Sequence, residues 1–278
     1  MGSVALAMGL TAMLVSGWVE SFFFFPDKVQ YSAPVQFGLK AEDIWLPAVD
    51  GSKLHAWFLP ARSVAGSSAR GTVLHLHGNA ANISNHLPFV AWLPAQGFNV
   101  LTLDYRGFGK SEGKPSLDGV VDDAAVALAY LRTRPDVDPE RLIVLGQSLG
   151  GATALRLLAR DSAGVRLGVI DSAFTGYRTI ARDATVGPLA ALVPLVVGAL
   201  PTTDQDPIAA LARVSVPLIF VHGTRDRVIP HGHSAALHAA ATSTQYLWTV
   251  PDGDHVATCG ADGEWRHKLV QAMNEAVR

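Results

Sequence analysis

The chain has 278 residues, with 22 Lys and Arg against 24 Asp and Glu, which gives a formal net charge of −2. So small a charge excludes an electrostatic basis for binding nucleic acid, and we expect no nucleic-acid partner. Apolar residues make up 49% of the chain and charged residues only 17%, which excludes an intrinsically disordered chain. Cys259 is the only cysteine, so the chain can form neither an intrachain disulfide nor a cysteine-based zinc site.

The amino terminus is an apolar segment. Glu20 is the only charged residue between positions 4 and 25, and a run of about 20 apolar residues is what a helix needs to cross a bilayer. Four phenylalanines and then Lys28 follow, as expected where a helix leaves the membrane. We therefore predict that residues 1–27 form a single-pass membrane-anchor helix in contact with membrane lipid, and that residues 28–278 form one folded domain.

Two other interpretations of this segment stay open. A cleaved signal peptide would need a basic residue before the apolar run, and the first basic residue is Lys28. A buried or oligomer-forming helix is the second alternative. The sequence fixes neither the orientation of an anchor nor the oligomeric state.

Short apolar strands alternate with amphipathic helices from Phe37 onward. Strands near 39–46 and 53–59 flank an Asp50-Gly51 turn and predict an antiparallel hairpin. Buried strands are then expected at 72–77, 99–105, 141–145, 167–170, 218–222 and 246–250. The expected helices lie at 83–96, 117–132, 149–160, 233–241 and 262–277. This pattern is typical of an α/β fold, with a mostly parallel sheet of about eight strands and helices on both faces.

One stretch interrupts the alternation. Four prolines divide residues 174–213 into short apolar pieces, and we expect a short helical lid inserted between two strands. Its central part, residues 186–200, has no charged side chain, so it should line an apolar pocket or touch lipid rather than face water. Leu192 and Val196 are its candidate substrate-binding residues. The alternative is that the stretch folds inward as ordinary core.

A candidate nucleophile lies between the strand at 141–145 and the helix at 149–160. Residues 146–150 form a Gly-x-Ser-x-Gly sequence, which in this context predicts a sharp turn that presents the hydroxyl of Ser148 above the sheet. A helix start with an ordinary capping serine is the plainer interpretation. A phosphate-binding loop is disfavoured because the Gly-Lys-Ser/Thr ending is missing.

A serine nucleophile needs a base, and the base needs a carboxylate that fixes its tautomer and stabilises its cation. In the expected architecture the acid and then the histidine follow the serine, each at the carboxyl end of a later strand. Asp226 follows the strand at 218–222 and His255 follows the strand at 246–250, so both fit. Asp171 also stands at a strand end and is the competing acid.

An acyl-transfer site also needs N–H donors for the oxyanion. We expect one from the backbone of Leu149, directly after the serine, and one from the backbone of Asn79, in the loop after the strand at 72–77. His77 should hold this loop in place rather than react.

Other polar residues are expected to be structural. Asp104, Arg106 and Ser111 should hold the loop after their strand through hydrogen bonds. His231 and His233 could be combined with His222 as metal ligands, but two histidines spaced i and i+2 at a helix start point apart, and no carboxylate cluster accompanies them. We therefore expect neither a metal nor a cofactor.

Four motifs together carry a family resemblance. They are His77-Gly78-Asn79-Ala80, the run from Leu103 to Ser111, the elbow from Gly146 to Gly151, and His222-Gly223-Thr224-Arg225-Asp226 with Val228-Ile229-Pro230 after it. In these motifs residues 37–277 resemble the Bem46 and ABHD13/ABHD17-like branch of the α/β-hydrolase superfamily. The resemblance implies an α/β-hydrolase fold with an amino-terminal anchor, a short lid and a triad of Ser148, Asp226 and His255. The unusually apolar lid departs from the branch.

The sequence thus predicts a membrane-anchored serine hydrolase. Its substrate would be a small-molecule ester or acyl compound, and it would cleave carboxylic esters or thioesters of apolar acyl groups. A catalytically silent α/β-hydrolase scaffold that binds a lipid or a partner is the alternative from another class. A lyase or a cofactor-free oxygenase on the same fold is a third possibility. The resemblance does not fix the substrate, because the branch includes both esterases and protein depalmitoylases.

Overall fold

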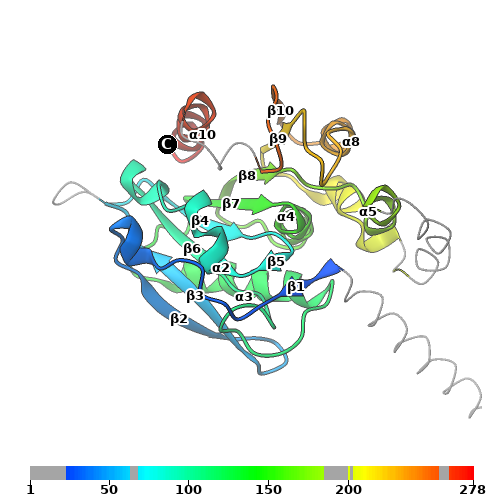
Figure 1. Ribbon diagram of the computed structural model, residues 1–278. Helices are drawn as coiled ribbons and strands as arrows, with labels where there is room; N and C mark the ends of the chain where they lie inside the picture. The colour runs from blue at the N-terminus through cyan, green and yellow to red at the C-terminus, as the bar shows by residue number, and fades with distance from the viewer. Residues whose placement is uncertain (1–22, 63–67, 185–199, 201–202, 257–262) are drawn as a thin grey trace, which may run out of the picture.

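The computed structural model describes residues 23–62, 68–184, 200, 203–256 and 263–278 (Figure 1). Its main sheet has eight strands in the order β10-β9-β8-β7-β4-β6-β3-β2. Every neighbouring pair from β6 across to β10 is parallel. The predicted α/β architecture with a mostly parallel sheet is therefore confirmed.

The antiparallel edge of the sheet is the predicted hairpin. β2 (Glu42–Pro47) and β3 (Lys53–Leu59) pair antiparallel across a turn in which the N–H of Gly51 donates to the carbonyl of Ala48 at 2.9 Å. β3 also pairs antiparallel with β6 (Phe98–Leu103). The hairpin therefore lies at the opposite edge of the sheet from β9 and β10.

Buried strands make up the rest of the sheet. They are β4 (Gly71–Leu76), β7 (Leu142–Gln147), β8 (Val165–Asp171), β9 (Leu218–Gly223) and β10 (Gln245–Val250). Every residue of β4, β7 and β9 is buried, as expected for parallel strands covered on both faces. The register sets Asp171 opposite both Gln147 and Val221, so β7, β8 and β9 end at one edge.

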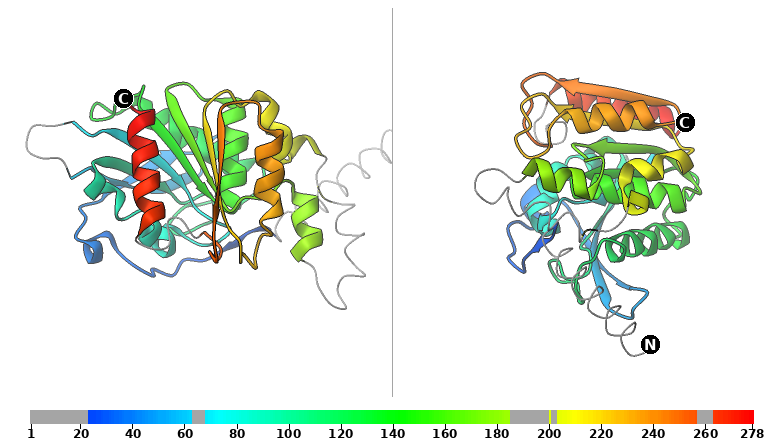
Figure 2. Two further views of the ribbon diagram at one scale, coloured as in Figure 1. Left: turned by 90° about the horizontal axis from the view of Figure 1, so that it is seen from above. Right: turned by 90° about the vertical axis from the view of Figure 1, so that its right-hand side faces the viewer.

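Helices lie along both faces of the twisted sheet (Figure 2). One apolar core takes in side chains of α3 (Gly119–Thr133), α4 (Leu149–Arg160) and α8 (Gly232–Ala240). The other takes in α10 (Glu264–Ala276), where Leu269 and Met273 are fully buried. Burying one such side chain contributes about 1.5–3 kcal/mol, so the helices in the two apolar cores stabilise the sheet from both of its faces.

The predicted single helix at 83–96 is wrong. The chain there forms α2 (Ile83–His86) and two 3₁₀ turns, η3 (Leu87–Phe89) and η4 (Leu93–Gln96). Each 3₁₀ turn carries a proline near its start, Pro88 and Pro94, and a proline removes a helical hydrogen bond and clashes with the preceding turn. The apolar spacing correctly indicated which side chains are buried, but the two prolines prevent one continuous helix.

A second, two-stranded sheet was not predicted. β1 (Phe25–Pro26) runs parallel to β5 (Ala80–Ala81), which lies in the loop after β4. Phe24 is also buried in the main apolar core. Residues 23–27, which we had assigned to the anchor, therefore contact the folded domain.

The described part of the lid stretch contains α5 (Tyr177–Ala184), η6 (Thr203–Gln205), α7 (Pro207–Ala210) and η7 (Leu211–Arg213). Leu192 and Val196 lie outside the described residues, as does the predicted anchor up to residue 22. Among the residues that the structure describes, no helix is both long and apolar enough to cross a membrane.

Candidate active site

Ser148 occupies a strained turn between β7 and α4. Its backbone dihedrals are φ 55° and ψ −118°, and its N–H donates to the carbonyl of Asp171 at 2.8 Å. A positive φ is disfavoured for a residue with a Cβ, so the surrounding structure must impose it. The strain is what lifts the serine side chain out of the line of the strand, as the Gly-x-Ser-x-Gly sequence predicts.

The glycines on either side of Ser148 make this turn possible. A Cβ on Gly150 would collide with the carbonyl of Leu76, and a Cβ on Gly146 would collide with the carbonyl of Gly150. Both obstacles are backbone atoms, which cannot swing aside as a side chain can. The two glycines therefore let α4 start directly against the ends of β4 and β7.

Asp226 and His255 form a close pair at the same edge. His255 Nδ1 lies 2.7 Å from Asp226 Oδ2, although the two residues are 29 positions apart. The Asp226 side chain has no exposed surface, while 21% of the His255 side chain is exposed. The other carboxylate oxygen accepts the N–H groups of Val228 and Ile229, both at 2.8 Å. Because Nδ1 of His255 faces the carboxylate, Nε2 is on the side of the ring that faces away from it.

A second histidine, which the sequence analysis considered only as a metal ligand, also contacts Asp226. His222 Nε2 lies 3.1 Å from Asp226 Oδ2 and 2.8 Å from the carbonyl oxygen of Ile229. A carbonyl can only accept, so Nε2 carries the proton, and Nδ1, at 2.7 Å, accepts from the hydroxyl of Ser234. The spacing His-x-x-x-Asp at a strand end is the signal that could have indicated this pair.

These contacts decide the charge on Asp226. Burial raises the pKa of the carboxyl, but hydrogen bonds from His222 and His255 outweigh burial and hold the pKa below its ordinary value. The carboxylate is therefore ionised across the neutral pH range.

The competing acid has different surroundings. Asp171 is fully buried, its Oδ1 lies 3.1 Å from the hydroxyl of Ser172, and its Oδ2 has no hydrogen-bond partner among the described residues. Burial raises the pKa of Asp171 to about 6. The N–H of Val256 donates to the hydroxyl of Ser172 at 3.1 Å, which fixes the loop of His255 over this strand end.

The loop after β4 lies against the serine. A Cβ built on Gly78 would stand 3.7 Å from Ser148 Cβ. His77 Nδ1 donates to the carbonyl of Gly78 at 2.7 Å, and burial lowers the pKa of His77 well below its ordinary value, so the ring is neutral. In a trans peptide the C=O and the next N–H point in opposite directions, so the N–H of Asn79 is turned away from His77.

Leu149 is the first residue of α4, and no residue of that helix can accept its N–H.

Asp104 and Ser111 brace the loop after β6. Asp104 accepts the N–H of Ile83 at 2.9 Å, and the hydroxyl of Ser111 donates to the carbonyl of Asp104 at 2.6 Å. Arg106 forms an ion pair with Asp123 at 2.6 Å.

Of the histidines weighed as metal ligands, His222 and His231 lie edge to face with ring centroids 5.5 Å apart, but each ring bonds different partners. His233 lies 2.8 Å from Asp183, and His231 lies 3.0 Å from the hydroxyl of Thr249. Within the described ranges, no cluster of three or more histidine, cysteine or acidic side chains could hold a metal ion.

Three features are typical of an α/β-hydrolase. They are a mostly parallel sheet with this strand order, a strained serine after a central strand, and an Asp–His pair at later strand ends. Residues 67–197 match the family described as "Serine aminopeptidase, S33". The chain is 40% identical over 255 residues to the protein YfhR of Escherichia coli K12, covering 91% of this chain and 86% of that protein. It is 30% identical to Bem46 of Schizosaccharomyces pombe, covering 83% of this chain and 76% of Bem46.

Among solved structures, the chain is similar to the esterase Pf2001 of Pyrococcus furiosus. The TM-score is 0.71 at 23% identity, with 91% of this chain and 98% of that chain covered. That likeness shows the fold, and the family follows from the sequence relatives. The chain is also 32% identical to the α/β-hydrolase domain-containing protein WAV2 of Arabidopsis thaliana, covering 95% of this chain and 92% of that protein. It therefore belongs to the α/β-hydrolase superfamily. Within it, the chain belongs to the branch that includes Bem46.

Proposed function

We propose that the protein hydrolyses carboxylic esters, thioesters included, through an acyl-enzyme on Ser148. The observation that carries the proposal is the 2.7 Å contact between His255 and Asp226 at the strand edge where the strained Ser148 turn also ends. The three residues take the roles of base, acid and nucleophile.

In the first half-reaction His255 Nε2 removes the proton of the Ser148 hydroxyl while the serine oxygen attacks the ester carbonyl. The N–H groups of Leu149 and Asn79 donate to the resulting oxyanion. As the intermediate collapses, the bond to the leaving alcohol or thiol breaks, and His255 returns the proton to that group. Asp226 stays ionised throughout and stabilises the imidazolium.

Water then repeats the sequence on the acyl-enzyme. His255 takes a proton from the water that attacks the acyl carbonyl and returns it to the serine oxygen as the carboxylic acid leaves. No further group has to enter the balance, because water supplies both the hydroxyl and the proton.

We propose apolar acyl groups as the substrate class. The uncharged lid stretch 186–200, with Leu192 and Val196, supports a pocket for a hydrocarbon chain. That the structurally similar Pf2001 is an esterase supports ester chemistry. The apolar segment before Lys28 supports a membrane anchor that keeps the domain beside lipid.

A fluorophosphonate probe tests the nucleophile. We expect the probe to label the full chain and to leave Ser148→Ala unlabelled, because only an activated serine reacts. Labelling that persists on another residue in Ser148→Ala would overturn the assignment.

A substrate panel tests the bond and the acyl group. p-Nitrophenyl esters from acetate to palmitate, a matched thioester and a p-nitroanilide should be compared with and without detergent. We expect esters and thioesters to be cleaved and the anilide to be left intact, with kcat/KM rising a few-fold per added carbon and then levelling off. A flat profile, or faster cleavage of the anilide, would contradict the proposed substrate class.

A further inference from the structure

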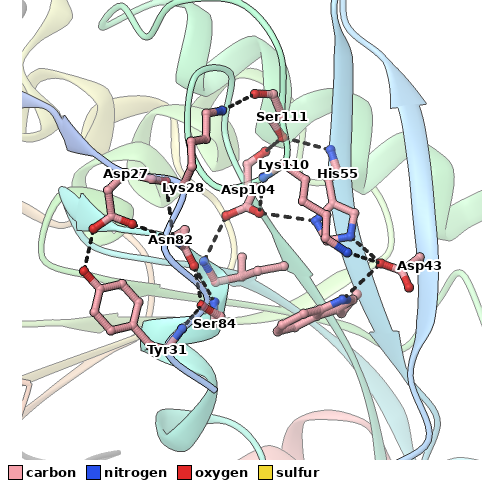
Figure 3. A network of polar contacts seen from close by, with 12 residues as sticks. Asp27, Lys28, Tyr31, Asp43, His55, Asn82, Ser84, Asp104, Lys110 and Ser111 are labelled. Carbon is pink, nitrogen blue, oxygen red and sulfur yellow. Dashed lines mark hydrogen bonds and ion pairs between the residues drawn. The ribbon is translucent and has the colours of Figure 1, made fainter. Parts of the chain in front are cut away.

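Residues 23–32 form a strap that crosses the loop of residues 78–84, which we call the oxyanion loop. In Figure 3 side chains of the strap and of the loop converge on one another, with Asp27, Tyr31, Asn82 and Ser84 in one connected network. None of these strap residues belongs to the proposed triad. The strap can therefore act on the site through the oxyanion loop.

The backbone contacts are those of a small sheet. The N–H of Phe25 donates to the carbonyl of Asn79 at 2.8 Å, and the N–H of Asp27 donates to the carbonyl of Ala81 at 3.2 Å. β5 pairs with β1 alone within the part of the chain that the structure describes. The strap is therefore the sheet partner of the oxyanion loop.

Side chains add a second set of bonds. The amide of Asn82 donates to Asp27 Oδ1 and to the carbonyl of Val29, both at 2.8 Å. The carbonyl oxygen of the same side chain accepts the N–H of Ser84 at 2.9 Å and so caps α2. The N–H of Tyr31 donates to the hydroxyl of Ser84 at 2.9 Å. Each end of the loop is thus bonded to the strap.

The loop also contains a backbone conformation that needs outside support. Ala81 has φ 61°, in the left-handed region that a residue with a Cβ disfavours. Such conformations persist only where the surroundings impose them. The bond from Asp27 to the Ala81 carbonyl is one of the contacts that does so.

The strap is itself fixed on the rest of the domain. Phe24 is 5% exposed and its ring packs edge-on against Phe108, with centroids 6.4 Å apart. The ring of Phe23 packs against Tyr177 of α5 at 5.3 Å. The ammonium of Lys28 donates to the carbonyl of Ser111 at 2.8 Å. A support anchored on both α5 and the loop after β6 can hold a loop in place, whereas a loose segment could not.

We infer that the strap is a positioning element of the catalytic site, which holds the N–H of Asn79 in place for the oxyanion. Two bonds act on the peptides that flank this N–H. His77 holds the carbonyl of Gly78 on one side, and the N–H of Phe25 holds the carbonyl of Asn79 on the other. Because a peptide is planar, the bond from His77 to the Gly78 carbonyl fixes the direction of the Asn79 N–H in the same peptide, and the bond from Phe25 to the next peptide keeps Asn79 itself from moving. The inference rests on the proposed oxyanion role of Asn79.

Phe25→Pro in the full chain tests this inference, because proline has no N–H to donate to Asn79. The Phe25 side chain is 58% exposed, so few packing contacts change with it. Phe25→Ala removes the same ring but keeps the N–H and is the reference. We expect kcat on p-nitrophenyl acetate to be ~10-fold to 100-fold lower in Phe25→Pro than in Phe25→Ala, with KM changed less than about twofold.

Val49→Pro is the matched control for the proline itself. Val49 is 74% exposed at the second position of the β2–β3 turn, where proline is favoured, and we expect its kcat to equal that of the wild type. The affinity for a boronic-acid transition-state analogue should fall in parallel with kcat in Phe25→Pro, which a purely structural role would not produce. Equal kcat and equal analogue affinity in Phe25→Pro and Phe25→Ala would overturn the inference.

Amide hydrogen exchange separates this inference from the proposed function. In Phe25→Pro we expect faster exchange at residues 79–84 and unchanged exchange in β7, whatever the substrate of the enzyme. If the wild type cleaves no member of the panel, the proposed function fails and exchange alone decides whether the strap holds the loop. Unchanged exchange at residues 79–84 would show that it does not.

Discussion

Two aspartates stand at the ends of neighbouring strands, β8 and β9, and their carboxyl groups have opposite surroundings. Asp226 receives two backbone N–H groups and contacts two histidines. Its side chain is covered although the residue as a whole is half-buried, whereas Asp171 is buried entirely and its Oδ2 has no hydrogen-bond partner among the described residues. Burial alone raises a carboxyl pKa, whereas burial with several donors lowers it. Position at a strand end therefore does not by itself set the charge of an acid, because the donors around the carboxyl group decide it.

Replacing each acid by its amide should give the largest contrast. Asp226→Asn keeps the shape but loses the charge that stabilises the His255 imidazolium, and we expect kcat to fall by ~10³–10⁴. Asp171→Asn should lower kcat less than about tenfold, since His255 keeps its carboxylate partner. Steady-state kinetics on p-nitrophenyl acetate measure both, with circular dichroism to show that both variants are folded. A larger loss in Asp171→Asn would reverse the assignment of the acid.

The pH dependence of stability should separate the two acids by sign. An unfolded aspartate titrates near pH 4, and Asp171 titrates at about 6 in the folded chain, so the folded state binds the proton more tightly. The contribution of Asp171 to the free energy of unfolding is therefore fully present below about pH 4 and is lost as the pH rises through about 6. For a difference of two pKa units the loss is ~3 kcal/mol. The lowered pKa of Asp226 acts the other way, contributing stability above about pH 4 that is lost at lower pH.

Urea unfolding of the wild type and of Asp171→Asn at pH 4.5 and pH 7.5 measures this difference. The wild type should lose stability relative to the variant between the two values. A constant difference between the two proteins would show that Asp171 does not titrate in this window.

The elements around the two acids show what the sequence could predict. The serine turn, the hairpin and the strand ends were predicted because each depends on neighbours within a few positions, such as the glycines beside Ser148. Asp226 and His255 could be placed because parallel strands end at one edge. The geometry of these residues follows from local sequence and topology.

Contacts between distant segments could not be predicted in the same way. Asn82 bonds Asp27 across 55 positions, and neither residue belongs to a motif. The strap was therefore read as the end of an anchor, because its phenylalanines continue the apolar run. The prediction of one helix at 83–96 was wrong for a local reason, because it rested on the apolar spacing although Pro88 interrupts a continuous helix.

His222 gives the finest test of the comparison, with an effect on kcat far smaller than that of Asp226→Asn. Its Nε2–H is shared between Asp226 and the carbonyl of Ile229 and is a donor that Asp171 lacks, and a hydrogen bond to a charged group contributes about 1.5–3 kcal/mol. Asp226 keeps His255 and two N–H donors without it, so we expect His222→Ala to lower kcat only about tenfold, with KM unchanged.

The matched variant is His222→Gln, whose side-chain amide can still donate at the place of Nε2. We expect it to recover most of the lost kcat, because the donor to Asp226 matters rather than the ring. If His222→Ala lowers only the melting temperature and leaves kcat intact at a temperature where it is folded, His222 supports the fold and not the charge of Asp226. Equal kcat in the alanine and glutamine variants, both below the wild type, would show instead that the ring and its bond to Ser234 are what position the acid.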